Sequence, residues 1–175
     1  MWRRRIFRYL LPTLAFLVAC AFQTTVWPAL MGSFMAPPLW ILIFAWLSIY
    51  RPTSDTILFL YVLGILATAF TAMPIKVMLF LILGLHGILH LARSRVFWPG
   101  SGYFLIVSVA SVALYNILSI LISRFMEPSM APFMVTDRLL QILLSIPFSV
   151  VIYAVMNFLE RPFTPDTLAE TGGQG

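Results

Sequence analysis

The chain consists of long apolar runs, and its few charged residues stand mainly at the ends of those runs. Hydrophobic residues make up 61% of its 175 residues and charged residues only 10%. A soluble domain of ordinary composition has about 25% charged residues, whereas apolar stretches of about 20 residues are long enough to cross a bilayer as helices. The pattern predicts an all-α fold, a polytopic membrane protein with roughly six transmembrane helices in a single bundle over residues 1–161.

Proline, glycine and charged residues mark the ends of the apolar runs. Proline lacks a backbone N–H and ends or kinks a helix, and Pro-Gly clusters mark turns. We therefore expect helices at about residues 7–27, 31–50, 56–73, 75–92, 103–123 and 138–159. Trp27 and Pro28 are expected to close the first helix at the membrane interface, and Pro147 to kink the last. Residues 162–175 are expected to form a disordered cytoplasmic tail.

Lysine and arginine are distributed unequally between the two sides of this predicted bundle. With the N-terminus inside, the cytoplasmic cations are Arg3, Arg4, Arg5, Arg8, Arg51, Arg93, Arg95 and Arg161. The outside cations are Lys76, Arg124 and Arg138. Cytoplasmic loops carry the excess of positive charge, so both termini are predicted to be cytoplasmic. The third run is the weakest span, and the C-terminus would lie outside if that run were re-entrant.

The positive net charge of +5 does not indicate a nucleic-acid-binding protein. Its arginine cluster stands just before the first apolar run, where anionic lipid headgroups attract it, and the chain has no room for a soluble domain. On the outer side, Glu127 and Asp137 are expected to pair with the neighbouring Arg124 and Arg138. The lipid bilayer is therefore the expected partner of these charges, and no nucleic acid is expected.

Residues that could carry chemistry are few. His86 and His90 are four positions apart, so they share a helix face and have a spacing that can bind a metal or haem. Either group would need further ligands in the membrane, and none are obvious. The alternative is that both histidines line a contact between helices, with His90 near the cytoplasmic interface. Cys20 is the only cysteine, which excludes an intramolecular disulfide. No nucleophile, base and orienting group can be assembled, so neither an enzyme nor a cofactor or metal site is expected.

Small residues recur at helical spacing. Such residues let helix backbones approach closely in lipid, either within one bundle or toward a partner. Packing within the bundle is the commoner use. The candidate partner-interface residues are Ala15, Ala19, Gly64, Thr68, Gly84 and Gly87. Asn116 and Gln141 lie inside apolar runs, and buried amides in lipid are expected to hydrogen-bond across helices.

The order of these features resembles the MreD family of bacterial rod-shape determination. The resemblance covers about residues 7–161: an apolar first helix ending in Trp27-Pro28, a Pro-containing entry at residues 36–42, a polar turn at 51–55, and a third helix with Gly64. The family's third helix commonly continues to an Asp, and this chain has Ala67 or Thr68 at that position. The resemblance implies a non-enzymatic scaffold of the inner (cytoplasmic) membrane in the cell-wall elongation machinery. The implied partners are an MreC-like bitopic protein, the wall-elongation glycosyltransferase and transpeptidase, and MreB filaments.

A second reading comes from the substrate-binding S components of energy-coupling-factor vitamin transporters, which the MreD family resembles in its six-helix layout. In those components, small residues of the first helix dock the transporter module, and Ala15 and Ala19 would have that role. A vitamin site would need several polar groups converging from the outer half. The available ones are Gln23, Thr24, Thr25, Asn116 and Arg124. A third class, small enzymes of lipid metabolism, would need acidic or histidine clusters at the interface, which the sequence lacks.

Overall fold

The structure is a computed structural model that describes residues 2–32, 34–51, 53–71, 73–96, 100–126 and 134–160. Every regular element in these residues is helical. The elements are α1 (Trp2–Ala21), the π-helical segment η1 (Phe22–Val26), α2 (Trp27–Met31), α3 (Leu39–Tyr50), α4 (Thr53–Thr68), α5 (Ile75–Arg95), α6 (Ser101–Met126) and α7 (Val135–Glu160). The predicted tail at residues 162–175 lies outside the described residues.

Four helical stretches among the described residues are long and apolar enough to cross a membrane. They are Tyr9–Met31, Ile75–Arg95, Ser101–Phe125 and Val135–Glu160. Helices α3 and α4 are apolar but shorter. The prediction of an all-α membrane helix bundle is therefore confirmed. Of the six predicted spans, four are long enough to cross a membrane unaided.

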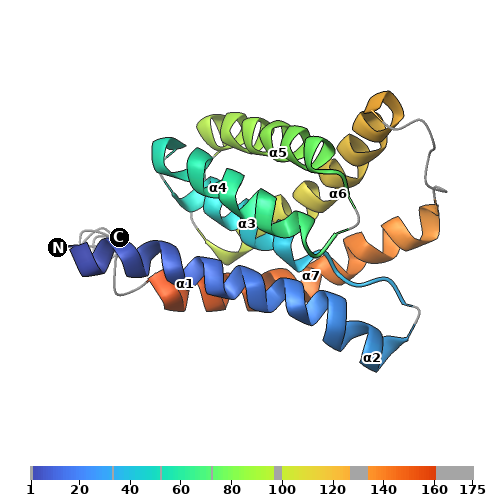
Figure 1. The fold of residues 1–175 in the computed structure, drawn as a ribbon, viewed down its shortest axis with the longest axis horizontal. Coiled ribbons are helices and arrows are strands. Elements are labelled where there is room, and N and C mark those ends of the chain that lie inside the picture. Colours follow the sequence, from blue (N-terminus) through green and yellow to red (C-terminus); the bar gives the residue numbers. More distant parts are fainter. Residues whose placement is uncertain are drawn as a thin grey trace.

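The bundle has two ends, and successive helices run between them in alternating directions (Figure 1). Helix α1 begins and α7 ends at the same end, where Arg51 and Glu160 meet. We call this the Arg51 end. The opposite end, where α5 and α7 begin, is called the Arg138 end. Arg93 donates to the Arg51 carbonyl, so these two cations, which were predicted to share a side, lie at the same end.

Helix α3 is the axis of the bundle. Its sequence is apolar on every side, and such a helix is stable only when other elements surround it. Every residue from Leu39 to Ile49 is buried, and α3 contacts α1, α4, α5, α6 and α7. Its 12 residues correspond to about 18 Å, which is shorter than the hydrocarbon core of about 30 Å. Alone, α3 is too short to cross the membrane.

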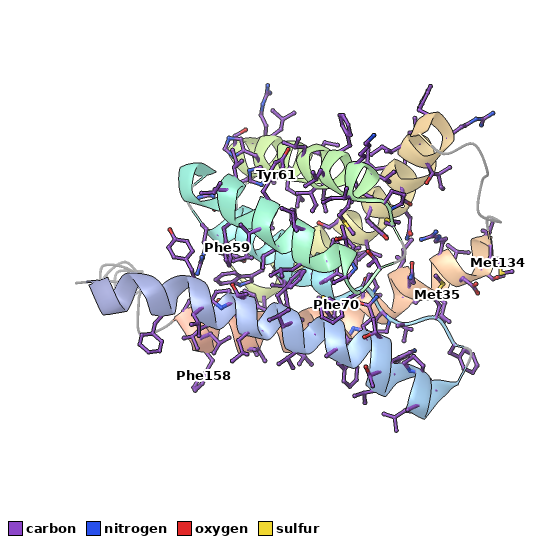
Figure 2. All side chains as sticks on the ribbon, in the orientation of Figure 1. Met35, Phe59, Tyr61, Phe70, Met134 and Phe158 are labelled. Carbon is purple, nitrogen blue, oxygen red and sulfur yellow. The ribbon has the colours of Figure 1, made fainter. Side chains whose placement is uncertain are left out.

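The outside of the bundle is apolar, as its core is. Large apolar side chains cover the outside, including Leu14, Leu58, Ile106, Leu143 and Phe158; Figure 2 shows Phe158 projecting away from the helices. Buried serines lie inside on α3, α6 and α7, at Ser48, Ser108, Ser111, Ser119, Ser145 and Ser149. Several donate to carbonyls of their own helix, as Ser145 does to Ile142 at 2.6 Å. An apolar exterior of this extent needs lipid around it.

The first helix does not end at Pro28, contrary to the prediction. The helical path continues through η1 and α2 to Met31. Proline clashes with the carbonyl four residues earlier in a regular α-helix, and the wider π turn, in which Trp27 N–H bonds to Phe22 O, removes that conflict. Trp27 is buried, and its indole N–H donates to the Phe34 carbonyl at 3.0 Å. It therefore stabilises the chain reversal that follows α2.

The second predicted helix, at residues 31–50, is only partly correct. Gly32 has a φ of +61° and ends α2, a conformation that favours glycine. The helical part begins at Leu39, after Pro37 and Pro38. Prolines cannot supply the N–H groups of a continuing helix, so the chain enters the bundle through a non-helical segment.

The remaining helices differ from the predicted ranges mainly at their ends. Helix α4 stops at Thr68 instead of residue 73, and Ala69 N–H and Phe70 N–H bond back to Leu66 and Ala67 in tight turns. Helices α5, α6 and α7 extend beyond the predicted ends by about a turn or less. Pro147 lies inside α7 without ending it.

Candidate functional site: polar clusters inside the bundle

The first cluster is built around Arg51 at the end of α3. The residue before a proline avoids the helical region, and Arg51, which precedes Pro52, is extended with φ −102° and ψ 153°. This turn ends the helix. Only 3% of Arg51 is exposed. A buried cation is costly unless it is paired and hydrogen-bonded.

Glu160, in the last turn of α7, provides that pairing. Arg51 Nε donates to Glu160 Oε1 at 3.0 Å, and Arg51 Nη2 donates to the same oxygen. The guanidinium carbon lies 5.6 Å from the centre of the Tyr9 ring and 5.4 Å from that of Phe59. Figure 2 shows Phe59 between α4 and α1. The cation is thus held by a carboxylate and two aromatic rings.

Arg93 adds a third helix end to this cluster. Its Nη1 donates to the Arg51 carbonyl at 2.7 Å. Carbonyls at a helix C-terminus have no partner within the helix, so Arg93 of α5 closes the end of α3. The Arg51 cluster, defined by Tyr9, Arg51, Phe59, Arg93 and Glu160, therefore joins α1, α3, α4, α5 and α7.

Arg51 was expected to be a cytoplasmic loop cation, and its burial corrects that view. The pairing with Glu160 joins residues 109 positions apart, so no local pattern reveals it. The available signal was that residues of opposite charge end two helices on the same predicted side. The structure places both residues at the same end of the bundle.

The second cluster lies at the Arg138 end. Arg138 Nη1 donates to Asn116 Oδ1 at 2.9 Å, and Gln141 Nε2 donates to the Ala36 carbonyl at 3.4 Å. Asn116 therefore bonds across helices, as predicted, whereas Gln141 bonds to the non-helical segment that precedes α3. The expected pair of Arg138 with Asp137 is wrong, because among the described residues the ion pair is Arg51 with Glu160. The Glu127 of the other predicted pair lies outside the described residues.

Two polar atoms of this Arg138 cluster are buried without a hydrogen-bond partner among the described residues. They are Asn116 Nδ2 and Gln141 Oε1. One is a donor and the other an acceptor. Both lie near the Arg138 guanidinium in the chain's fold, since Asn116 bonds to Arg138 and Gln141 follows Arg138 by three residues on α7.

His86 and His90 occupy different environments. His86 is 6% exposed, and its Nδ1 lies 3.1 Å from the Ser48 hydroxyl of α3. The His90 ring stacks on His86 with centroids 6.2 Å apart and is exposed. His86 Nε2 has no partner in the described part of the chain, and His86 is one of the residues that line a cavity of about 10 Å³. No group of three His, Cys, Asp or Glu side chains gathers within that part.

The small residues divide into internal and external positions. Ala19 and Gly64 are buried, and a Cβ on Gly64 would lie 2.1 Å from Ile82 Cδ1 of α5. Ala15 is half-buried against the core. Gly84 is half-buried, and a Cβ there would lie 3.4 Å from Leu118 of α6. These positions serve the chain's own packing.

Two small residues remain at the periphery. Thr68 is half-buried, and its hydroxyl donates to the Ile65 carbonyl of its own helix at 2.7 Å. Gly87 is exposed, and a Cβ added there would have no described atom of another residue within 4 Å. Leu83, Gly87 and Leu91 are spaced by four residues on α5 and are all exposed. They form one apolar face of α5. Because Gly87 has no side chain, it leaves a notch between the two leucines.

No protein-family model, curated protein or solved structure matches the chain.

Proposed function

We propose that the chain is an MreD-like scaffold of the bacterial wall-elongation machinery. In this proposal it is a multi-pass protein of the cytoplasmic membrane with six membrane-inserted helices and both termini in the cytoplasm. It holds the transmembrane helix of an MreC-like bitopic partner, and through that partner the wall-elongation glycosyltransferase and transpeptidase. MreB filaments lie on the cytoplasmic side. It has no catalytic role.

The observation that carries this proposal is the open notch at Gly87. Helix association in lipid depends on close packing at small residues. Ala19 and Gly64 are already covered by the chain's own helices, whereas Gly87 lies exposed between Leu83 and Leu91. A partner helix can therefore bring its backbone close to α5 at this position. Helix α5, which carries this position, packs against the buried helix α3 and is joined to the Arg51 cluster through Arg93.

The test is co-purification from membranes in mild detergent. Gly87→Leu fills the notch with a side chain, so recovery of a bitopic partner should fall several-fold relative to the unmodified protein. Gly102→Leu is the matched control, because Gly102 is also an exposed helical glycine with nothing within 4 Å of its Cβ position. Deleting the gene from its bacterial host should convert rods to round cells. Equal partner recovery with Gly87→Leu and Gly102→Leu would contradict the proposal.

The second candidate is a substrate-binding S component of an energy-coupling-factor vitamin transporter. The Arg138 cluster favours it, because the Arg138–Asn116 bond and Gln141, three residues further along α7, lie at the end of the bundle predicted to face outside. In this reading a polar group of the vitamin bonds to Asn116 Nδ2 and Gln141 Oε1. Host cells that stay rod-shaped after gene deletion but fail to take up one vitamin would support this function over the scaffold.

A further inference from the structure

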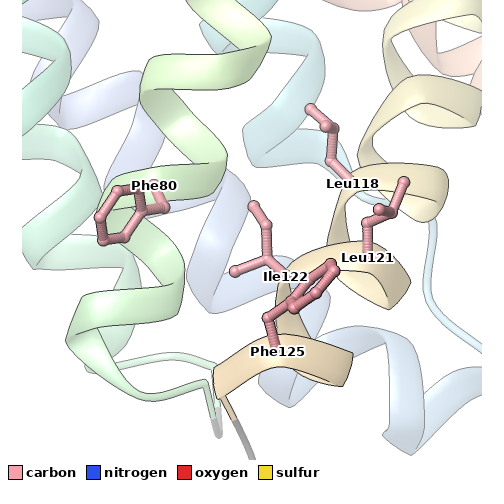
Figure 3. A pocket seen from close by; sticks show the side chains of 5 residues that line it. All are labelled: Phe80, Leu118, Leu121, Ile122 and Phe125. Carbon is pink, nitrogen blue, oxygen red and sulfur yellow. The ribbon is translucent and has the colours of Figure 1, made fainter.

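An apolar groove lies on the outside of the bundle between α5 and α6. Its volume is about 320 Å³, and its lining is Phe80 from α5 with Leu118, Leu121, Ile122 and Phe125 from α6. Figure 3 shows these five side chains, with Ile122 between the two helices in this view. Phe125 is 82% exposed. All of the lining side chains are hydrocarbon, so the groove suits an apolar chain.

The position of the groove follows from the packing of the two helices. A Cβ on Gly84 would lie 3.4 Å from Leu118, so α5 and α6 approach closely at this level. The helices run in opposite directions, and one turn toward the Arg138 end brings Phe80 to the level of Ile122. A further turn brings Lys76 to the level of the last turn of α6. The groove therefore opens toward Lys76 and Arg124.

Two cations stand at the ends of the two helices toward which the groove opens. Lys76 shares a helix face with Phe80 because the two are four residues apart, and Arg124 lies next to Phe125 in the last turn of α6. Both side chains are exposed. Within the described ranges, neither forms an ion pair with an acidic residue. The opening therefore combines two positive charges with a hydrocarbon floor.

The first turn of α5 adds hydrogen-bond donors to the same place. The N-cap is Pro74, no side chain caps the helix, and the first turn contains no acidic residue. The N–H groups of a first helical turn have no partner within the helix, and the helix dipole attracts an anion there. Lys76 strengthens that attraction. An anion at this point would satisfy the N–H groups and offset the cation.

We propose that this site binds an anionic phospholipid. The phosphate lies at the first turn of α5 between Lys76 and Arg124, and one acyl chain occupies the groove along Phe80, Leu121 and Phe125. The volume is at the low end of small-molecule sites, about 300–1,000 Å³, and a partner helix about 10 Å across would not enter it. The charges distinguish an anionic lipid from a zwitterionic one, because the zwitterionic headgroup adds a cation beside Lys76 and Arg124.

Native mass spectrometry of the purified full-length chain tests the proposal. The probes are phosphatidylglycerol and phosphatidylcholine with identical acyl chains. The unmodified protein should retain phosphatidylglycerol preferentially. That preference should fall about fivefold for each cation removed in Lys76→Gln and Arg124→Gln. Arg95→Gln is the control, since Arg95 is an exposed cation in the last turn of α5, at the Arg51 end.

A second variant tests the groove apart from the charges. Leu121→Trp fills the groove, so retention of both lipids should fall while the cations remain in place. Glycerol 1-phosphate, which carries the anion without acyl chains, should not displace the bound lipid at equal concentration. Displacement by glycerol 1-phosphate, or an unchanged lipid preference in the double variant Lys76→Gln/Arg124→Gln, would overturn the assignment. All of these side chains are exposed, so the variants should fold normally.

Discussion

Arg51 and Glu160 lie 109 positions apart in the chain, and Arg51 Nε donates to a Glu160 carboxylate oxygen at 3.0 Å within the bundle. The bond joins the end of the axial helix α3 to the end of α7, the last helix described. Both charges are removed from water, with exposed side-chain fractions of 3% and 15%. Desolvation offsets much of the attraction in such a pair. Its main consequence is therefore to specify which helix ends meet.

Breaking this pair on one side should be strongly destabilising. Arg51→Met leaves a carboxylate without its cation, and Glu160→Gln leaves a buried guanidinium without its anion. Each should lower the free energy of unfolding by about 3–5 kcal/mol, whereas the apolar double variant Arg51→Met/Glu160→Leu should cost less than the sum. Unfolding in detergent, followed by circular dichroism, gives the double-mutant cycle. Additive effects of the two single changes would show that the charges act independently.

Gly64 should tolerate no large side chain. A Cβ there would lie 2.1 Å from Ile82 Cδ1, so Gly64→Leu must displace the buried Ile82 side chain or push α4 from α5, at a cost of about 1–3 kcal/mol typical of overpacked cores. Gly102→Leu faces open space and should leave the unfolding midpoint unchanged. Adding Ile82→Ala to Gly64→Leu should recover part of the loss. If Ile82→Ala restored no stability to Gly64→Leu, the strain would not arise from the contact with Ile82.

His86 and His90 are expected to bind neither metal nor haem. His86 Nδ1 is engaged with Ser48, and two histidines alone provide too few ligands for a closed zinc site, which needs about four. Elemental analysis and visible absorption of the purified protein should be the same for the unmodified chain and for His86→Leu/His90→Leu. A stoichiometric metal or haem that disappears in the double variant would reverse this expectation.

The proposed orientation can be measured through introduced cysteines. Cys20 is 2% exposed, so the native thiol should contribute little background labelling. Arg95→Cys and Lys76→Cys introduce exposed thiols at the two ends of α5. A membrane-impermeant maleimide added to intact cells should label Lys76→Cys and leave Arg95→Cys unlabelled until the membrane is permeabilised. The reverse pattern would place both termini outside the cytoplasm.

The predicted helix ranges were most accurate where a run was long and ended in charged residues. Helix α5 begins at Ile75 as predicted and ends at Arg95, because Pro74 and the basic residues mark the two ends locally. Around Pro28 the same reasoning was wrong. A proline excludes a regular α-helical turn, but a π turn accommodates it, and the choice depends on the packing of Trp27 and Phe34.

The candidate site was predicted less completely than the fold. Residue spacing identified Gly87 as a small residue on a helix, but only the packed helices distinguish its exposed position from that of Gly64, which contacts Ile82. That Asn116 and Gln141 would bond to distant groups was predictable, since buried amides in lipid need partners. Their partners, Arg138 and the Ala36 carbonyl, were not, because they depend on which helices are neighbours.

The sequence by itself determined that this protein is an all-α membrane bundle, because apolar runs of this length leave backbone groups that only helices satisfy in lipid. It also indicated that the described cations stand near helix ends, since the charged residues of the sequence flank its apolar runs. Only the tertiary structure decided that α3 is the axis, that Arg51 is buried with Glu160, and that Gly87 is left open. The physical reason is that these features are pairings between distant helices, and the periodicity of a single helix carries no information about its neighbours.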